Sequence, residues 1–411
     1  MSAATHQRFD RLAPAHHDAR TGRRVWNLTP FDDAHCVCPY FYLQPMSADE
    51  RYLAFASDRD GRWELYRLDL TTGETLKLFD RRGEPGLDYD DLWNTFVPGT
   101  NRLMVFDNGT YREMEIESLA CRTVLQSPDP SRMRLHTPGT RLDDGRMAST
   151  FRDPVTGHYG IAVTEGGDGL CREAFRWTHP ERTLTHLLSV PGRSSEVTVV
   201  PVPDRQNHKD PSDPLRARCW KVNLDTGESW PFLTMPVGRR ATHEYWEPTR
   251  GRLFFHRKTV RTWTPTEIAS IDRDGGRYRE HYASTTRQLG HSFVSPDGRW
   301  LVTDIQEPHH NELILIDLES GDSQVICWPD SSMADQPIGH VHPLFSPSGG
   351  TILFTTDTSG KAGIYAVAVD WDTDTDTDTD TATDKEADAD AEADPAKAPL
   401  AEAGKGVQRD A

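Results

Sequence analysis

Histidines recur in this chain at a fixed distance before proline. His243, His291 and His342 each stand five residues ahead of a proline, at positions 248, 296 and 347. The shared register predicts that the three side chains occupy one structural position in three consecutive units of a repeat. Imidazole is the commonest metal ligand and the side chain best suited to proton transfer near neutral pH. This position is therefore the main candidate for chemistry.

A further histidine, His340, stands two residues before His342. Residues two apart on an extended strand project from the same face, so the two imidazoles could hold one cation. His291 could supply a third nitrogen, and Gln336 or a water molecule could complete a mixed nitrogen and oxygen set that suits a borderline or hard divalent ion. The alternative is that these are ordinary core or surface histidines, but their common register favours the metal site.

Arg218 is a candidate for binding an anion. Arg216, Arg218 and Trp220 alternate along the chain, which predicts that they share one strand face. The planar guanidinium of Arg218 could clamp a carboxylate through two hydrogen bonds, and a solvated arginine is the alternative. Its position just after a polar insertion, residues 206–214, is the local indication of function.

Short strands separated by Gly- and Asp-rich turns must position these residues. Strand-like runs closed by such turns recur about every 45 to 53 residues, and the run from Thr351 to Thr356 repeats the pattern of Tyr52 to Ser57. About seven such units predict an all-β chain that folds as a seven-bladed β-propeller, with the first strand of each blade nearest the axis. The histidines would then face one axial space.

The ends of the chain predict how the ring closes. The last unit supplies about three strands before Asp370, and Arg23 to Leu28 form one strand-like run that is expected to complete that blade, because an open edge is a liability. The predicted organisation is a flexible N-terminus over 1–20, the propeller over 21–370 and a disordered acidic tail over 371–411. Residues 370–411 hold fourteen acidic and four basic side chains, a charge density that opposes ordering.

The composition of the chain narrows the classes of partner and the compartment that are expected. The net charge is −18 without a basic stripe, so no nucleic-acid partner is expected. No apolar stretch of about 18 residues is present to insert into a membrane. Six scattered cysteines fit a reducing compartment, so a cytoplasmic protein is predicted. The chain has no Gly-x-Ser-x-Gly elbow and no second globular region, so any chemistry belongs to the ring; nothing indicates its oligomeric state.

From about Arg23 to Val369 the chain resembles the bacterial oligogalacturonate lyases. The matching pieces are Leu28-Thr29-Pro30, Tyr40-Phe41-Tyr42, Trp63 to Leu70, Ala217-Arg218 ahead of Trp220, Thr242 to Trp246, His291, and His340-Val341-His342-Pro343. The resemblance implies a seven-bladed propeller that holds manganese near its axis and cleaves a small acidic oligosaccharide. The family acts on short oligogalacturonates, chiefly the disaccharide, by β-elimination.

The resemblance also implies a role for each candidate residue. His243 matches the histidine taken as the catalytic base, and Arg218 matches the arginine that assists at the substrate. The residues that match the family's metal ligands are His291, His340, His342 and Gln336. These roles agree with the chemistry, since a divalent ion on the uronate carboxylate would draw off charge while an imidazole takes the C5 proton.

Two alternatives stay open at this stage. One is a non-catalytic propeller, similar to the WD40 or TolB-type rings, that binds a protein or peptide. The other is a lyase or epimerase acting on another acidic sugar. The chain also departs from the family pattern, because Gln336 stands four residues before His340 instead of three, and Cys36-Val37-Cys38-Pro39 replaces a Cys-His pair ahead of Tyr40. The joint presence of a base candidate and a metal set favours an enzyme.

Overall fold

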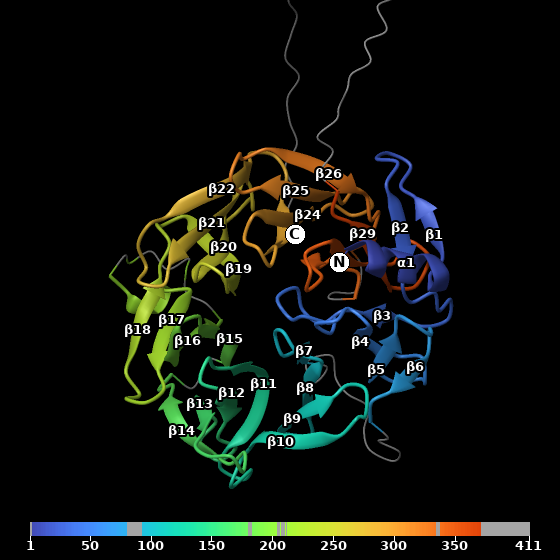
Figure 1. Ribbon diagram of the computed structural model, residues 1–411. Coiled ribbons are helices and arrows are strands. Elements are labelled where there is room, and N and C mark those ends of the chain that lie inside the picture. Colours follow the sequence, from blue (N-terminus) through green and yellow to red (C-terminus); the bar gives the residue numbers. More distant parts are fainter. Residues whose placement is uncertain are drawn as a thin grey trace, which may run out of the picture. The chain divides into compact units, whose positions relative to one another are not determined.

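The protein folds as a ring of seven antiparallel sheets, which confirms the predicted seven-bladed β-propeller (Figure 1). The computed structural model describes residues 2–79, 93–179, 183–203, 206, 210, 212–333 and 338–370. Residues Met1–Asp370 make one compact unit. The tail predicted over 371–411 lies outside the described residues.

Blades 1 to 6 are four-stranded meanders in which neighbouring strands follow one another in the chain. Blade 1 comprises β3 (Cys36–Val37), β4 (Tyr52–Ser57), β5 (Glu64–Asp69) and β6 (Thr75–Lys77). Blade 2 comprises β7 (Asn94–Phe96), β8 (Arg102–Asp107), β9 (Thr110–Glu115) and β10 (Cys121–Gln126). Blade 3 comprises β11 (Arg134–Arg141), β12 (Met147–Arg152), β13 (Tyr159–Thr164) and β14 (Cys171–Arg176).

Blades 4 to 6 repeat the arrangement on the other side of the ring. Blade 4 comprises β15 (Thr183–Val190), β16 (Arg193–Val202), β17 (Cys219–Asn223) and β18 (Ser229–Leu233). Blade 5 comprises β19 (Arg239–Glu247), β20 (Arg252–Thr259), β21 (Thr266–Asp272) and β22 (Arg279–Ser284). Blade 6 comprises β23 (Leu289–Val294), β24 (Trp300–Ile305), β25 (Leu313–Asp317) and β26 (Ser323–Cys327).

Burial follows the position of a strand within its blade. The second strand of blade 1, β4, is buried at all six residues, because neighbouring blades cover both of its faces. The outermost strand of blade 5, β22, has no fully buried residue. Figure 1 shows this order in blades 3 to 5, with β11, β15 and β19 toward the centre and β14, β18 and β22 outside.

The last blade closes the ring with N-terminal strands, as predicted. It contains β27 (Leu344–Phe345), β28 (Thr351–Thr356) and β29 (Gly363–Ala368), and β2 (Arg24–Asn27) pairs antiparallel with β29. Val25 lies opposite Val367, and Leu28 donates a backbone hydrogen bond to the Ile364 carbonyl at 2.8 Å. The outer edge of β29 is therefore covered.

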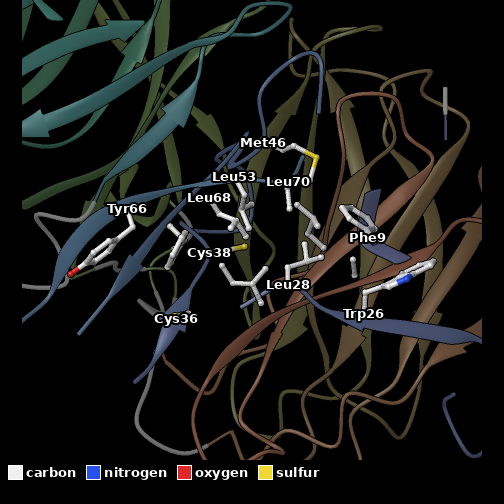
Figure 2. Close-up of a cluster of buried hydrophobic side chains, with 14 of the residues drawn as sticks. Phe9, Trp26, Leu28, Cys36, Cys38, Met46, Leu53, Tyr66, Leu68 and Leu70 are labelled. Carbon is white, nitrogen blue, oxygen red and sulfur yellow. The ribbon is translucent and has the colours of Figure 1, made fainter. Parts of the chain in front are cut away.

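Residues 1–20, expected to be flexible, contain two elements instead. Helix α1 (Ser2–Leu12) inserts Phe9, which has no exposed surface, beside Trp26 and Leu28 (Figure 2). Strand β1 (Ala15–His17) adds a fifth strand to the last sheet by pairing with β2. Burial of the Phe9 side chain stabilises the docked helix by about 1.5 to 3 kcal/mol. None of the helices in the described part of the chain has the length and apolar character needed to cross a membrane.

Bulges interrupt the innermost strands of blades 4, 5 and 6. The pairing register shifts between Thr185 and Leu188 on β15, between Thr242 and Tyr245 on β19, and between Leu289 and Ser292 on β23. A bulge leaves residues outside the ladder and turns their side chains away from the pleat. The histidines of blades 5 and 6 lie in these bulges.

Candidate active site

Three histidines from two blades converge near the axis. The ring centroid of His291, on β23, lies 4.2 Å from that of His342 and 5.6 Å from that of His340, and the two latter rings are 5.4 Å apart. One ligand atom from each ring falls within 4.8 Å of the others. Since a metal to imidazole nitrogen bond is about 2.1 Å long, small side-chain movements would bring all three nitrogens onto one ion.

The route to this arrangement differs from the one that the sequence suggested. His340 and His342 were expected to project from one face of an extended strand, but the strand β27 begins only at Leu344. His342 has a φ of 44°, in the left-handed region that residues other than glycine rarely adopt. A kinked loop ahead of the strand therefore brings the two rings together.

The three imidazoles fit a divalent cation. Nδ1 of His291, Nε2 of His340 and Nε2 of His342 are buried and have no hydrogen-bond partner among the described residues. Burial lowers the pKa of all three, that of His342 to about 3, and the neighbouring rings lower the pKa of His291 and His342 further. Neutral imidazoles with unused nitrogens are the form that binds metal.

Asp304 on β24 supports this cluster from behind. One of its carboxylate oxygens accepts a hydrogen bond from the backbone N–H of His291 at 2.5 Å and lies 3.7 Å from Nδ1 of that ring. Burial raises the pKa of Asp304 to about 7. The hydrogen bond to Asp304 therefore fixes the backbone of His291. Gln336, the fourth predicted ligand, lies outside the described residues.

His243 lies beside the metal cluster without belonging to it. Its ring centroid is 4.3 Å from that of His291, and its Nδ1 is 2.5 Å from the carbonyl oxygen of Gly290. A carbonyl oxygen only accepts, so Nδ1 carries the proton and Nε2 keeps its lone pair. Burial, followed by the charge of Lys258, lowers the pKa of His243 well below its ordinary value. A neutral imidazole with a fixed tautomer can take a proton.

Lys258 on β20 is a buried cation behind His243. It has no exposed surface, and its Nζ has no hydrogen-bond partner among the described residues. Nζ lies 5.0 Å from the Trp263 ring centroid, and this cation–π contact offsets part of the desolvation cost of the ammonium group. Burial lowers the pKa of Lys258 to about 7. No pattern in the sequence indicated a role for this residue.

Arg218 binds a carboxylate of the protein itself. Its Nε and Nη2 atoms donate to the two carboxylate oxygens of Glu244, at 2.7 and 3.0 Å, and both side chains are buried. Burial acts to raise the pKa of Glu244, but the guanidinium opposes it and the net pKa is lowered. Glu244 follows His243 directly, so this pair joins blade 4 to the base candidate.

The expected strand around Arg218 is absent. Residues Pro214–Arg216 form the 3₁₀ helix η2, and β17 begins only at Cys219, so Arg216 and Arg218 do not share a strand face with Trp220. Asp213 caps η2 by accepting from the Leu215 N–H at 2.9 Å. The turn that Asp213 caps thus leads into Arg218, which reaches Glu244.

Two further residues near this site had a signal in the sequence. His186 stands five residues before Pro191, and Tyr40 stands five residues before Pro45, the same register as the other histidines. The Tyr40 ring lies 5.8 Å from His186 and 5.1 Å from His342. Applying the proline spacing to every blade would have found both.

The sequence is similar to known lyases along most of its length. No family model matches the chain. An oligogalacturonide lyase of Pectobacterium atrosepticum is 24% identical over 384 residues, and an oligogalacturonate lyase of Dickeya dadantii is 25% identical over 386 residues. Each alignment covers 86% of this chain and 95% of the relative. The chain is therefore similar to oligogalacturonate lyases over 86% of its length.

Solved structures of oligogalacturonate lyases share the fold. An oligogalacturonate lyase in complex with manganese superposes with a TM-score of 0.72 at 23% identity, and one from Vibrio parahaemolyticus with a TM-score of 0.71 at 20% identity. Each superposition covers 87% of this chain and 96% of the other. The chain therefore shares the propeller fold of both structures.

Proposed function

We propose that this protein is a metal-assisted lyase that cleaves short oligogalacturonates by β-elimination. The observation that carries the proposal is that a candidate metal site and a candidate base lie side by side. Three imidazoles with unused nitrogens lie within reach of one cation, and a fourth imidazole of fixed tautomer lies 4.3 Å from one of them. The two sequence relatives are named for this activity, and the alignments cover 95% of each of them.

The proposed metal ligands are His291, His340 and His342, with Gln336 as a fourth, and manganese is the proposed ion because it is bound in a solved relative. A divalent cation held there supplies a Lewis acid for the carboxylate of the substrate, next to the carbon that loses its proton. The oxygen and nitrogen donors of this set suit such an ion. The buried surroundings strengthen the interaction with a carboxylate.

His243 is the proposed general base. Nε2 takes the proton from C5 of the uronate, and the electron pair of that C–H bond forms the C4–C5 double bond. The bond between C4 and its oxygen breaks, and the leaving oxygen keeps that electron pair and takes a proton from water. The Gly290 carbonyl stabilises the resulting imidazolium, because it accepts from Nδ1 at 2.5 Å. Proton abstraction by a positioned side chain contributes about 10²- to 10⁴-fold to a rate.

Arg218 is proposed to assist at the substrate while Glu244 holds it. The bidentate pair fixes the guanidinium plane from two donors, at 2.7 and 3.0 Å. A prepositioned cation beside developing negative charge lowers the barrier without reorganisation.

The direct test is turnover on digalacturonate with manganese and with a chelator. The proposal predicts an increase in absorbance from the unsaturated uronate product, lost on chelation and restored by adding manganese. Inversion at C5 without a double bond would identify an epimerase, and an inert protein that binds manganese would contradict the lyase. A cytoplasmic location is part of the proposal, because all six cysteines are free thiols.

A further inference from the structure

Blades 4 to 7 each carry a histidine on the innermost strand or just before it. His186, His243, His291 and His342 each stand five residues before a proline. His186 and His243 share more than spacing. Both lie in a bulge of the innermost strand and have a left-handed φ, of 48° and 58°. The proposed function gives a task to the last three of these residues and none to His186.

His186 faces polar groups of the proposed site. Its ring lies 5.8 Å from that of Tyr40, whose own ring is 5.1 Å from His342 and 5.7 Å from His291. It also interacts electrostatically with Glu244 and Arg218. Tyr40 therefore lies beside both His186 and the metal cluster, and His186 is close to the Arg218–Glu244 pair.

One nitrogen of His186 is available for a ligand. Nδ1 is 3.2 Å from the hydroxyl oxygen of Thr185, which also reaches the Val200 carbonyl at 3.3 Å. That contact occupies Nδ1 in either tautomer, and the structure records no hydrogen bond to Nε2 among the described residues. The side chain is only partly buried. A strained backbone that exposes one imidazole nitrogen is typical of a functional position.

We infer that His186 contacts the substrate and positions it. Resting on the proposed function, this inference assigns to Nε2 of His186 a hydrogen bond with a ring hydroxyl of the uronate whose carboxylate faces the metal cluster. The metal cluster and Arg218 recognise charge, which all uronates share, whereas a hydroxyl contact depends on the configuration of the ring carbons. His186 is then a residue that selects among uronates.

Three variants separate this role from a structural one. His186→Asn keeps an amide that can make the contact, and asparagine tolerates a left-handed φ. His186→Leu removes the contact. His309→Leu is the matched control, because His309 also has a left-handed φ, of 58°, but is exposed and outside this cluster.

Kinetics on digalacturonate give the first readout. We expect His186→Leu to raise KM about 10- to 100-fold, the loss of one or two hydrogen bonds, with manganese content unchanged and a much smaller effect on kcat. His186→Asn should recover most of the KM, and His309→Leu should behave as wild type. An unchanged KM in His186→Leu, or a loss of manganese with it, overturns the inference.

A binding experiment keeps the inference testable if the lyase activity itself is absent. The side-chain signals of ¹⁵N-labelled histidines in the manganese-free protein are followed while D-galacturonate is added, and His186 is assigned by its absence in His186→Asn. Saturable movement of the His186 signal supports the contact even without turnover. A His186 signal that stays still while galacturonate saturates the protein overturns it.

Discussion

At the scale of single residues, the described part of the site leaves several buried polar atoms without a hydrogen-bond partner. Most buried polar atoms in proteins are hydrogen-bonded. Here the unpartnered ones include three imidazole nitrogens and Nζ of Lys258, all within blades 5 to 7. The proposed cation would explain why the imidazole nitrogens have no hydrogen-bond partner, because they would bind it. Lys258 remains a buried charge that the fold keeps at a cost.

The burial of Lys258 predicts how the stability of the folded protein changes with pH. Burial lowers its pKa from 10.5 to about 7, so the folded chain binds fewer protons than the unfolded chain between those values. Stability should therefore rise with pH from about 7 toward 10, by roughly 1.4 kcal/mol for each unit of displaced pKa at most. We expect Lys258→Met to be more stable than wild type at pH 7 and to lose this rise, measured by chemical denaturation at several pH values.

Lys221 is the matched control for that experiment. It is equally buried, but its Nζ binds Glu196 Oε2 at 2.9 Å. Lys221→Met should destabilise the protein at pH 7, because it leaves a carboxylate unpaired. The account of Lys258 is contradicted if both substitutions lower the free energy of unfolding by similar amounts.

At the scale of elements, bulges and tight backbone contacts aim the site residues. Gly290 is the clearest case, since its carbonyl accepts from His243 and its neighbour His291 is a proposed ligand. A Cβ at Gly290 would lie 2.5 Å from both carboxylate oxygens of Asp304 and 2.6 Å from Cγ of Gln306. Only glycine lets β23 approach β24 this closely.

Gly290→Ala should therefore weaken metal binding as well as stability. We expect an overpacking cost of about 1 to 3 kcal/mol and a fall in manganese affinity of roughly 10- to 100-fold, the range for residues that orient ligands. Gly167→Ala is the control, because a Cβ there meets nothing within 4 Å. Manganese titration and thermal unfolding of both variants check this, and wild-type affinity in Gly290→Ala would refute the positioning role.

The elements also show why the sequence predicted some parts of the site and not others. The spacing of histidine to proline marks one position per blade, so the meeting of His291 and His342 could be foreseen. The backbone at His342 could not, because a left-handed φ in a histidine depends on the surrounding packing. The partner of Arg218 is 26 residues away on the next blade, and no local pattern encodes that ion pair.

At the scale of the whole ring, the strand count and the closure were predictable, while the N-terminal helix was not. The regular alternation of short strands and turns specifies a propeller, and the missing outer strand of the last blade indicates where β2 belongs. Helix α1 is mainly polar, and only packing of Phe9 against Trp26 reveals its place. Such a contact joins segments that do not form one periodic pattern.

Closure through β2 should dominate the stability of the ring. Trp26 is 3% exposed, lies opposite Ala366 of β29 and donates from Nε1 to Asp10 at 2.8 Å. Trp26→Ala is expected to cost about 3 to 5 kcal/mol and to lower the thermal midpoint by several degrees. Trp230→Ala, at a tryptophan that is 37% exposed, should change the midpoint little. Equal midpoints would show that the N-terminal strand is dispensable.

The most direct test of the central claim is manganese titration by calorimetry, made on wild type, His342→Ala and His243→Ala. The account predicts one site in the wild type, a loss of at least about 100-fold in affinity for His342→Ala, and near wild-type affinity for His243→Ala. Turnover of His243→Ala on digalacturonate should nevertheless fall about 10²- to 10⁴-fold. Unchanged manganese binding in His342→Ala, or loss of the metal in His243→Ala, would contradict the division of these histidines into ligands and base.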